Sequence, residues 1–194
     1  SKDLITQLFD IHEKTAHTFL KNLGTEEGSK VLAHLESRGL SRDTIKKFKL
    51  GYSLKQKDAL LSAFRKEGVR SEAMKQSGLF IDTKGGYMDR FRGRIMFSIP
   101  NSSGKIAAFA GRVFESDDTA KYVNSPETPI YNKSKILYGL HETKQTIRES
   151  NSVIVVEGYL DFLQLYQSGI HNIVAVSGTA FTDQHALQIK RFCQ

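Results

Sequence analysis

Cysteine is nearly absent, because Cys193 is the single one among 194 residues. One thiol excludes an internal disulfide and a cysteine-built zinc site within these residues. The chain also lacks any run of about 18 consecutive apolar residues, the length that a membrane-spanning helix needs. Its first residues do not resemble a secretory signal peptide. We therefore expect a soluble cytoplasmic protein with no membrane partner.

Acidic residues are in the minority. The chain has 28 Lys and Arg against 21 Asp and Glu, a formal net charge of +7 and a pI near 9.4. This excess is typical of proteins that bind a polyanion, but a merely solubilising basic surface has the same composition. With 39% hydrophobic residues, the chain can build one large or two small domains around a core.

The spacing of the apolar residues changes along the chain, and neither an internal repeat nor a low-complexity tract interrupts it. Helical spacing predicts helices at about residues 4–23, 31–38, 41–48 and 59–64. Antiparallel strands are expected at 79–81, 94–99 and 106–110, with turns at 84–86 and 100–104. After a loop at 117–119, a strand–helix–strand–helix pattern occupies 153–156, 159–167, 173–176 and the residues from about 182 onward. The predicted fold class is therefore α/β.

The segment from Val153 to Asp161 carries the strongest functional signal. Residues 153–156 form an apolar run that predicts a buried parallel strand, and Glu157 and Gly158 follow it directly. A carboxylate in this place lies at the carboxyl edge of a sheet, where open α/β folds bind ligands. Asp161, four residues on, can share the same side of the first helical turn. Two such carboxylates suit Mg²⁺, which suggests phosphoryl-transfer chemistry.

Several loops add cations and small polar groups on the way to this edge. Arg112 follows an apolar strand, and segments 121–128 and 132–135 contain lysines and amides. The run Ser177–Thr179 follows the next predicted strand and could hold phosphate through hydroxyls and backbone N–H groups. An ordinary turn with a helix cap explains the same three residues.

The segment Asp89–Arg94 interleaves arginines with Phe91 just before a strand. This pattern suits a groove that holds a sugar-phosphate backbone and stacks a base. Arginines at alternating positions also describe the solvated face of an edge strand, so the pattern alone leaves both interpretations open.

Taken together, the ordered motifs resemble the RNA polymerase core of a bacterial DnaG-type primase. They are the segments 89–97, 110–112, 121–128, 137–140 and 155–161. The resemblance spans essentially the whole chain. It implies a mixed α/β (α+β) subdomain over residues 1–150 and the first part of a TOPRIM parallel-sheet α/β module over 151–194. It also implies synthesis of short RNA primers on single-stranded DNA at the replication fork.

The resemblance assigns roles to individual positions. Glu157 corresponds to the first acidic residue of the TOPRIM metal site, and Asp161 to a second catalytic carboxylate. The residues that correspond to the family's basic cleft, which binds template and incoming nucleotide, are Arg38, Arg112, Lys121, Tyr122, Asn124 and Lys133. Lys133 and Lys135 also fit a simpler role as solubilising surface charge. The implied ligands are Mg²⁺, or Mn²⁺ in its place, ribonucleoside triphosphates and a single-stranded template.

One feature departs from the family pattern. The aspartate-x-aspartate pair that completes the TOPRIM metal site does not occur after Glu157. We therefore expect a truncated core, with zinc and the replicative helicase bound by separate domains outside these residues. An incomplete carboxylate set should bind Mg²⁺ weakly.

Two other functions are compatible with parts of the sequence. The chain by itself could be only a nucleic-acid-binding module, which the missing acidic pair favours. Another TOPRIM enzyme, such as a type IA topoisomerase or an overcoming-lysogenisation-defect-like nuclease, would share the glutamate-glycine strand end. Neither of those enzymes accounts for segments 89–112 and 121–128.

Overall fold

The structure is a computed structural model that describes residues 2–115, 120–178 and 180–194. The loop expected at 117–119 and Thr179 therefore lie outside the described residues. The helices are α1 (Lys2–Asn22), α2 (Glu26–Ser37), α3 (Arg42–Lys47), α4 (Ala59–Lys66), α5 (Ser71–Gln76), α6 (Leu140–Ser150), α7 (Tyr159–Gln167) and α8 (Asp183–Ile189). The strands are β1 (Gly51–Ser53), β2 (Phe80–Thr83), β3 (Gly86–Asp89), β4 (Arg94–Pro100), β5 (Ile106–Val113), β6 (Tyr122–Asn124), β7 (Ile154–Val156) and β8 (Ile173–Ala175).

Side-chain caps fix the start of several helices. Thr25 accepts a hydrogen bond from the backbone N–H of Gly28, and Ser41 accepts one from Thr44, as the sequence predicts for Ser41. Thr182 and His185 form a reciprocal capping box at the start of α8. The Thr25 cap starts α2 at Glu26, five residues before the start at residue 31 that the spacing of apolar residues predicts.

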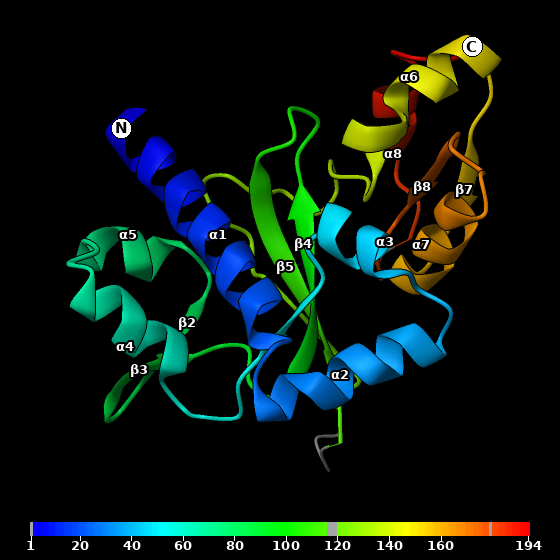
Figure 1. Ribbon diagram of the computed structural model, residues 1–194. Coiled ribbons are helices and arrows are strands. Elements are labelled where there is room, and N and C mark those ends of the chain that lie inside the picture. The colour runs from blue at the N-terminus through cyan, green and yellow to red at the C-terminus, as the bar shows by residue number, and fades with distance from the viewer. Residues whose placement is uncertain (1, 116–119, 179) are drawn as a thin grey trace.

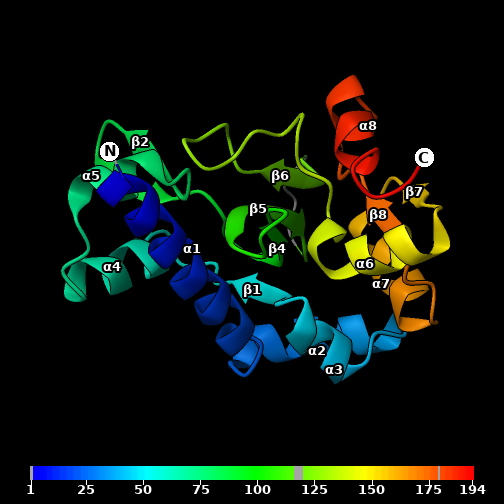
Figure 2. The same cartoon turned by 90° about the horizontal axis from the view of Figure 1, so that it is seen from above.

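A four-stranded antiparallel sheet in the order β1-β4-β5-β6 occupies the middle of the molecule. Helix α1 packs on β1 and β5, and α2 packs on β1. Figure 1 shows α4, α5 and the β2–β3 hairpin gathered at one end, and α6, α7, α8, β7 and β8 at the other. The view from above in Figure 2 shows the same division, with the sheet between the two groups.

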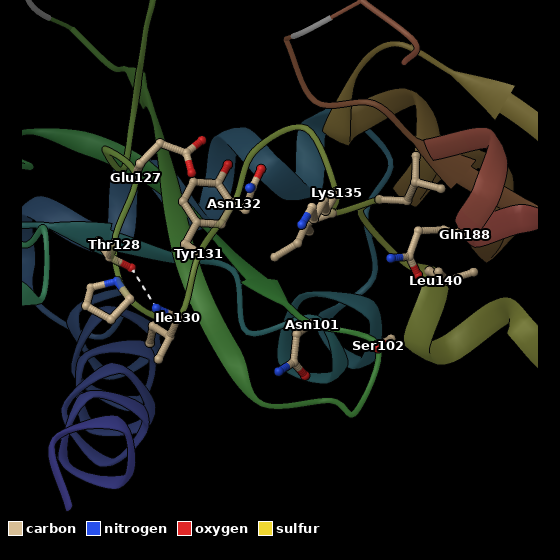
Figure 3. A pocket seen from close by; sticks show the side chains of 13 residues that line it. Asn101, Ser102, Glu127, Thr128, Ile130, Tyr131, Asn132, Lys135, Leu140 and Gln188 are labelled. Carbon is tan, nitrogen blue, oxygen red and sulfur yellow. Dashed lines mark hydrogen bonds between the residues drawn. The ribbon is translucent and has the colours of Figure 1, made fainter. Parts of the chain in front are cut away.

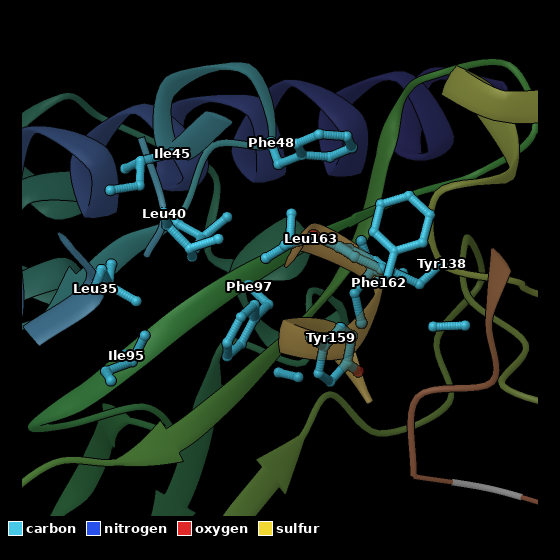
Figure 4. Close-up of a cluster of buried hydrophobic side chains, with 14 of the residues drawn as sticks. Leu35, Leu40, Ile45, Phe48, Ile95, Phe97, Tyr138, Tyr159, Phe162 and Leu163 are labelled. Carbon is cyan, nitrogen blue, oxygen red and sulfur yellow. The ribbon is translucent and has the colours of Figure 1, made fainter. Parts of the chain in front are cut away.

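The central strand β4 is buried on both faces because its side chains alternate between two cores. Ile95 and Phe97 belong to a cluster with side chains from α2, α3 and α7 (Figure 4). Met96 belongs to a second cluster with side chains from α1 and α4. The sheet is thus held between helices from distant parts of the sequence, and α7 is fixed to it through the first cluster.

Strands β7 and β8 pair in parallel, with Val156 opposite Ala175. Ile173 and Ala175 face the cluster that includes α7, whereas Val174 and Val176 face a third cluster with α6 and α8. Helices therefore cover both faces of β8. This confirms the predicted α/β fold class and the strand–helix–strand–helix pattern.

The prediction that the strand before Glu157 is buried is wrong. Ile154 and Val155 in β7 remain 42% and 41% exposed. Within the described residues, β8 is the one strand that pairs with β7, so β7 is an edge strand. An apolar run therefore indicated a strand correctly but did not indicate its burial.

Five elements were not predicted. These are β1, α5, β3, β6 and α6, of which β6 lies in a segment expected to be a loop. None of the helices in the described part of the chain combines the length and apolar character needed to cross a membrane. The division at residue 150 stays a prediction, and α6, which precedes it, packs on β8.

Candidate active site

Glu157 lies at the carboxyl end of β7, next to the carboxyl end of β8. Its backbone carbonyl accepts a hydrogen bond from the backbone N–H of Ser177 at 3.1 Å. The two strand ends therefore open on the same sheet edge. The Glu157 side chain is exposed, so its carboxylate is accessible to a ligand.

Gly158 leaves space for a second carboxylate beside Glu157. It is the N-cap of α7 and has an extended backbone, with φ −108° and ψ 154°. A Cβ atom on Gly158 would come within 3.0 Å of Oδ2 of Asp161. Asp161 lies in the first turn of α7, where the helix dipole stabilises a negative charge. The glutamate-glycine junction thus brings two acidic side chains to one helix start.

A cavity of about 670 Å³ adjoins both carboxylates and is also lined by Gln164. The Gln164 amide donates a hydrogen bond to the backbone carbonyl of Arg38 at 2.8 Å. This contact holds the turn after α2 against α7. Arg38, whose side chain is exposed, is therefore brought to the border of the cavity although it lies far away in the sequence.

Strand β6 and the residue before it place three predicted cleft residues, Lys121, Tyr122 and Asn124, next to this edge. Arg112 and Tyr122 are cross-strand partners on β5 and β6. The Tyr122 ring lies 6.2 Å from the ring of Tyr159, the first residue of α7. Lys121 directly precedes Tyr122, and its carbonyl accepts the backbone N–H of Val113 at 2.9 Å.

Charged groups on two sides influence the pKa of Tyr122. Burial raises the pKa of the Tyr122 phenol, and the positive charge of Arg112 acts in the opposite direction. The negative charge of Asp161 raises the pKa of Tyr122 further. One cation, one phenol and one carboxylate therefore share the space between β6 and α7.

The segment after β8 has an unusual backbone. Ser177 and Gly178 both have positive φ, at 56° and 79°. A Cβ atom on Gly178 would lie 3.9 Å from Nδ2 of Asn124, so the Asn124 amide faces this turn. Ser177 is a non-glycine residue in the left-handed region, which costs conformational energy and is found more often at functional sites.

Lys133 is placed less directly. It is half-buried, and its backbone N–H donates to Oε1 of Glu127 at 2.9 Å. Among the described residues, no hydrogen bond or ion pair joins the Lys133 side chain to Glu157 or Asp161. We call the sheet edge that carries Glu157 and Asp161 the acidic edge. The structure brings Arg112, Tyr122 and Asn124 to this edge, with Lys121 adjacent. Arg38 lies at the border of the cavity, and Lys133 lies on the loop that follows β6.

The base-stacking interpretation of Phe91 is wrong, and Arg94 in the same segment is structural. Phe91 is 2% exposed and packs in the core against Phe109. Arg94 is 3% exposed, and its guanidinium donates to the carbonyls of Gly111 and Ala120. These side chains fasten β4 to its neighbours and are not available to a nucleic acid.

The acidic edge fits a particular kind of metal ion. Within the described ranges, no three His, Cys, Asp or Glu side chains are grouped closely enough to hold a metal. Two carboxylates still suit Mg²⁺, which commonly takes one or two protein carboxylates and fills its other positions with waters and phosphates. A metal that needs nitrogen or sulfur ligands does not fit this donor set.

Tyr159 and Gln164 are site residues that sequence reasoning missed. Tyr159 stacks on Phe97 at 4.7 Å and so ties the start of α7 to the central sheet beside Tyr122. Its position directly after the glutamate-glycine pair was visible in the sequence, but its partner on β4 was not. Gln164 had no sequence signal, because its role depends on the docking of the turn at Arg38.

Two families match the chain. The "DNA primase catalytic core, N-terminal domain" matches residues 18–144, and the "Toprim domain" matches residues 151–193. The DNA primase of Listeria monocytogenes is 38% identical over 187 residues, which is 95% of this chain and 30% of that protein. The DNA primase of Pseudomonas aeruginosa is 42% identical over 160 residues, or 81% of this chain and 24% of that protein. The chain spans less than a third of the length of these curated relatives.

Solved structures agree with these matches. The RNA polymerase domain of Mycobacterium tuberculosis primase DnaG superposes with a TM-score of 0.92 at 29% identity, covering 97% of this chain and 62% of that chain. A DnaG primase catalytic domain bound to single-stranded DNA superposes with a TM-score of 0.88 at 34% identity. That comparison covers 100% of this chain and 62% of the other.

Proposed function

The chain belongs to the DNA primase catalytic core family, and from this premise we propose that it carries part of the nucleotidyl-transfer site of a primase. The whole protein would synthesise short RNA primers on a single-stranded DNA template from ribonucleoside triphosphates. The observation that carries this proposal is the juxtaposition of the acidic start of α7 with the basic edge of β6, through Tyr122 and Tyr159. A relative of this fold bound to single-stranded DNA supports a nucleic-acid template.

Glu157 and Asp161 are the residues that would hold Mg²⁺, or Mn²⁺ in its place. A divalent cation at such a site supplies charge neutralisation for phosphate oxygens and favours deprotonation of the attacking hydroxyl. These two protein ligands should bind the cation weakly, because two carboxylates alone leave most coordination positions to water or phosphate.

The residues of the chain contribute positioning and charge. Arg112, with its fixed guanidinium geometry, and Lys121 would neutralise phosphates of the template or of the incoming triphosphate. Tyr122 would pack against a sugar or base, because this residue is 37% exposed and the ring of Tyr159 lies beside its ring. Asn124 and the turn at Ser177 would contact the same nucleotide from the β8 side. Lys133 would contact the nucleic-acid strand further along its path.

Primer synthesis tests the proposal directly. In the full-length protein, Glu157→Gln should lower primer synthesis from ribonucleotides on single-stranded template by roughly 100-fold or more, as expected for loss of a charged ligand at a transfer site. Binding of single-stranded DNA, measured by fluorescence anisotropy, should change less than twofold. Glu149→Gln, an exposed glutamate on α6, is the matched control and should retain full synthesis. Full activity of Glu157→Gln would refute the assignment.

The second candidate function is nucleic-acid binding without catalysis, because the described residues supply only a pair of acidic groups at the edge. The 194-residue chain by itself would then bind nucleic acid and catalyse nothing, while the longer protein performs the chemistry. Product formed by the full-length protein, but not by this chain, in Mg²⁺ or Mn²⁺ would support this division. Zinc binding, helicase binding and a location at the replication fork would then be properties of the whole protein. The match over residues 18–144 favours a primase over other TOPRIM enzymes.

A further inference from the structure

A pocket separate from the acidic edge lies between the β4–β5 turn, the segment 127–137 and the helices α6 and α8. Its volume is about 440 Å³, which is within the usual range for small-molecule sites. None of the residues that line it is a carboxylate or basic cleft residue of the proposed transfer site. Figure 3 shows it from close by.

Hydrogen-bond donors dominate one part of this pocket. In Figure 3 the Lys135 ammonium and the Gln188 amide lie toward its middle. Asn101 also lines the pocket, and its Oδ1 already accepts the backbone N–H groups of Ser103 and Lys105, at 2.9 and 3.1 Å. With the oxygen occupied, Asn101 offers its NH₂ group to a ligand.

Asn132 is held in the same way on the opposite wall. Its Oδ1 accepts from the backbone N–H of Ser134 at 3.1 Å and from the Ser134 hydroxyl at 2.7 Å. The lining therefore combines one ammonium with amides whose free polar atoms are mainly N–H groups. Such a set is complementary to the oxygens of a phosphate group.

The rest of the lining has a different character. Glu127 contributes a carboxylate at the edge of the pocket, and its Oε1 is fixed by the backbone N–H of Lys133. Its negative charge adds to burial in raising the pKa of Tyr131 to about 12. Pro129 and Ile130 provide apolar surface. In Figure 3, Ile130 lies on the same side of the pocket as Glu127, and Leu140 lies beside Gln188 on the other side.

We propose that this pocket binds a mononucleotide. Its phosphate would lie against Lys135 and Gln188, its ribose hydroxyls would donate to Glu127, and its base would lie against Pro129 and Ile130. A purely apolar ligand would make no use of the ammonium and the amides, and a bare phosphate would make no use of the apolar wall and the carboxylate. The shared chemistry is a phosphate ester, whose source is a free nucleotide or the end of a nucleic-acid strand.

Such a ligand would touch the loop that carries the cleft. Residues 127–137 continue from β6, so the pocket and the proposed transfer site lie on one continuous segment. Gln188 comes from α8 in the TOPRIM part, and Asn101 comes from the central sheet. The mononucleotide would therefore connect both parts of the molecule.

Equilibrium binding of adenosine 5′-monophosphate, measured by calorimetry with the 194-residue chain, tests this proposal. Lys135→Gln and Gln188→Glu should each weaken binding at least tenfold, through loss of the cation and repulsion of the phosphate. Lys66→Gln is the matched control for Lys135, because Lys66 is exposed on α4 at the other end of the molecule, and it should bind within twofold of wild type. Circular dichroism of each variant checks that it is folded.

Further arms separate the possible sources and sites. Arg112→Ala should bind the mononucleotide as wild type does, which distinguishes this pocket from the proposed transfer site, where Arg112 would neutralise a phosphate. Inorganic phosphate should bind at least tenfold more weakly than adenosine 5′-monophosphate. A 5′-phosphorylated dinucleotide that binds as well as the mononucleotide would identify a strand end as the source, and one that binds much more weakly would identify a free nucleotide. Wild-type affinity in both pocket variants, equal binding of inorganic phosphate, or loss of binding in Arg112→Ala would overturn the proposal.

Discussion

The carboxylate of Asp161 lies over the backbone of Gly158, so that a methyl group on Gly158 would come within 3.0 Å of Oδ2. The backbone of Gly158 has φ −108°, a value that alanine adopts without strain. Position 158 therefore favours glycine because the Asp161 carboxylate lies so close, and not because of the backbone conformation.

We predict that Gly158→Ala lowers primer synthesis at least tenfold in the full-length protein while changing the free energy of unfolding by less than about 1 kcal/mol. The flexible Asp161 side chain can move away from the new methyl group at little cost, but its carboxylate then leaves the acidic edge. Gly85→Ala is the matched control, since a Cβ atom there meets nothing within 4 Å. Wild-type synthesis by Gly158→Ala would show that the position of Asp161 does not matter.

Arg112 should contribute one phosphate contact to template binding. Replacing it with alanine should weaken single-stranded DNA binding and make the slope of log affinity against log salt shallower by about 0.7, the value for one phosphate of a single strand. Lys121→Ala should behave in the same way. Lys75→Ala, an exposed lysine on α5 far from β6, should leave the slope unchanged. An unaltered slope in Arg112→Ala would place this cation outside the template path.

Two effects favour glycine at position 139, namely its positive φ and its close contact with Phe162, and a pair of variants can separate them. It has φ +84°, and a Cβ atom on it would lie 2.2 Å from the buried ring of Phe162. Gly39 has the similar φ of +87°, but nothing lies within 4 Å of its Cβ position. Gly39→Ala should therefore cost about 1–2 kcal/mol of unfolding free energy from backbone strain alone.

Gly139→Ala should cost that amount and a further 1–3 kcal/mol, roughly, from overpacking against Phe162. Chemical denaturation of the two variants side by side measures the difference. Equal losses would mean that the Phe162 ring moves aside freely, and that the contact between the start of α6 and α7 is loosely packed.

Local patterns in the sequence were sufficient for much of the fold. Ser41 caps α3 as predicted, and the glutamate-glycine pair follows a strand and begins a helix, because capping and strand ends depend on adjacent residues. The polar helix α6 was not recognised because its apolar face consists of little more than Leu140 and Ile147. Strand β6 has three residues, too few for a periodic signal, and is defined by its pairing with β5.

The parts of the site that sequence reasoning missed depend on contacts between distant segments. Arg94 is buried because two backbone carbonyls, from Gly111 and Ala120, satisfy its guanidinium. Nothing in the alternation of arginines reveals those acceptors. Similarly, the backbone of Arg38 is held against α7 by a hydrogen bond from Gln164, which is 126 residues away in the sequence.

Asp89 should make the stability of the chain depend on pH. It is 3% exposed and accepts the backbone N–H groups of Leu60 and Leu61, at 2.8 and 3.0 Å, where α4 begins. Burial raises the pKa of Asp89 from its ordinary 3.8 to about 6, although these two hydrogen bonds act in the opposite direction. The folded state then holds the proton more tightly than the unfolded chain. Asp89 therefore adds stability at low pH that is lost as the pH rises from about 4 through 6.

Urea denaturation of wild type and Asp89→Asn at pH 5 and pH 7 tests this expectation. Wild type should lose about 1 kcal/mol of stability relative to Asp89→Asn between the two pH values, because roughly half of the full effect of a two-unit pKa shift, about 3 kcal/mol, is already lost below pH 5. Buried His12, whose pKa is lowered by burial, makes the opposite contribution, because protonation below about 6.5 favours the unfolded chain. Since both proteins contain His12, its effect cancels in the difference. A difference that is the same at both pH values would show that the helix amides hold Asp89 ionised throughout.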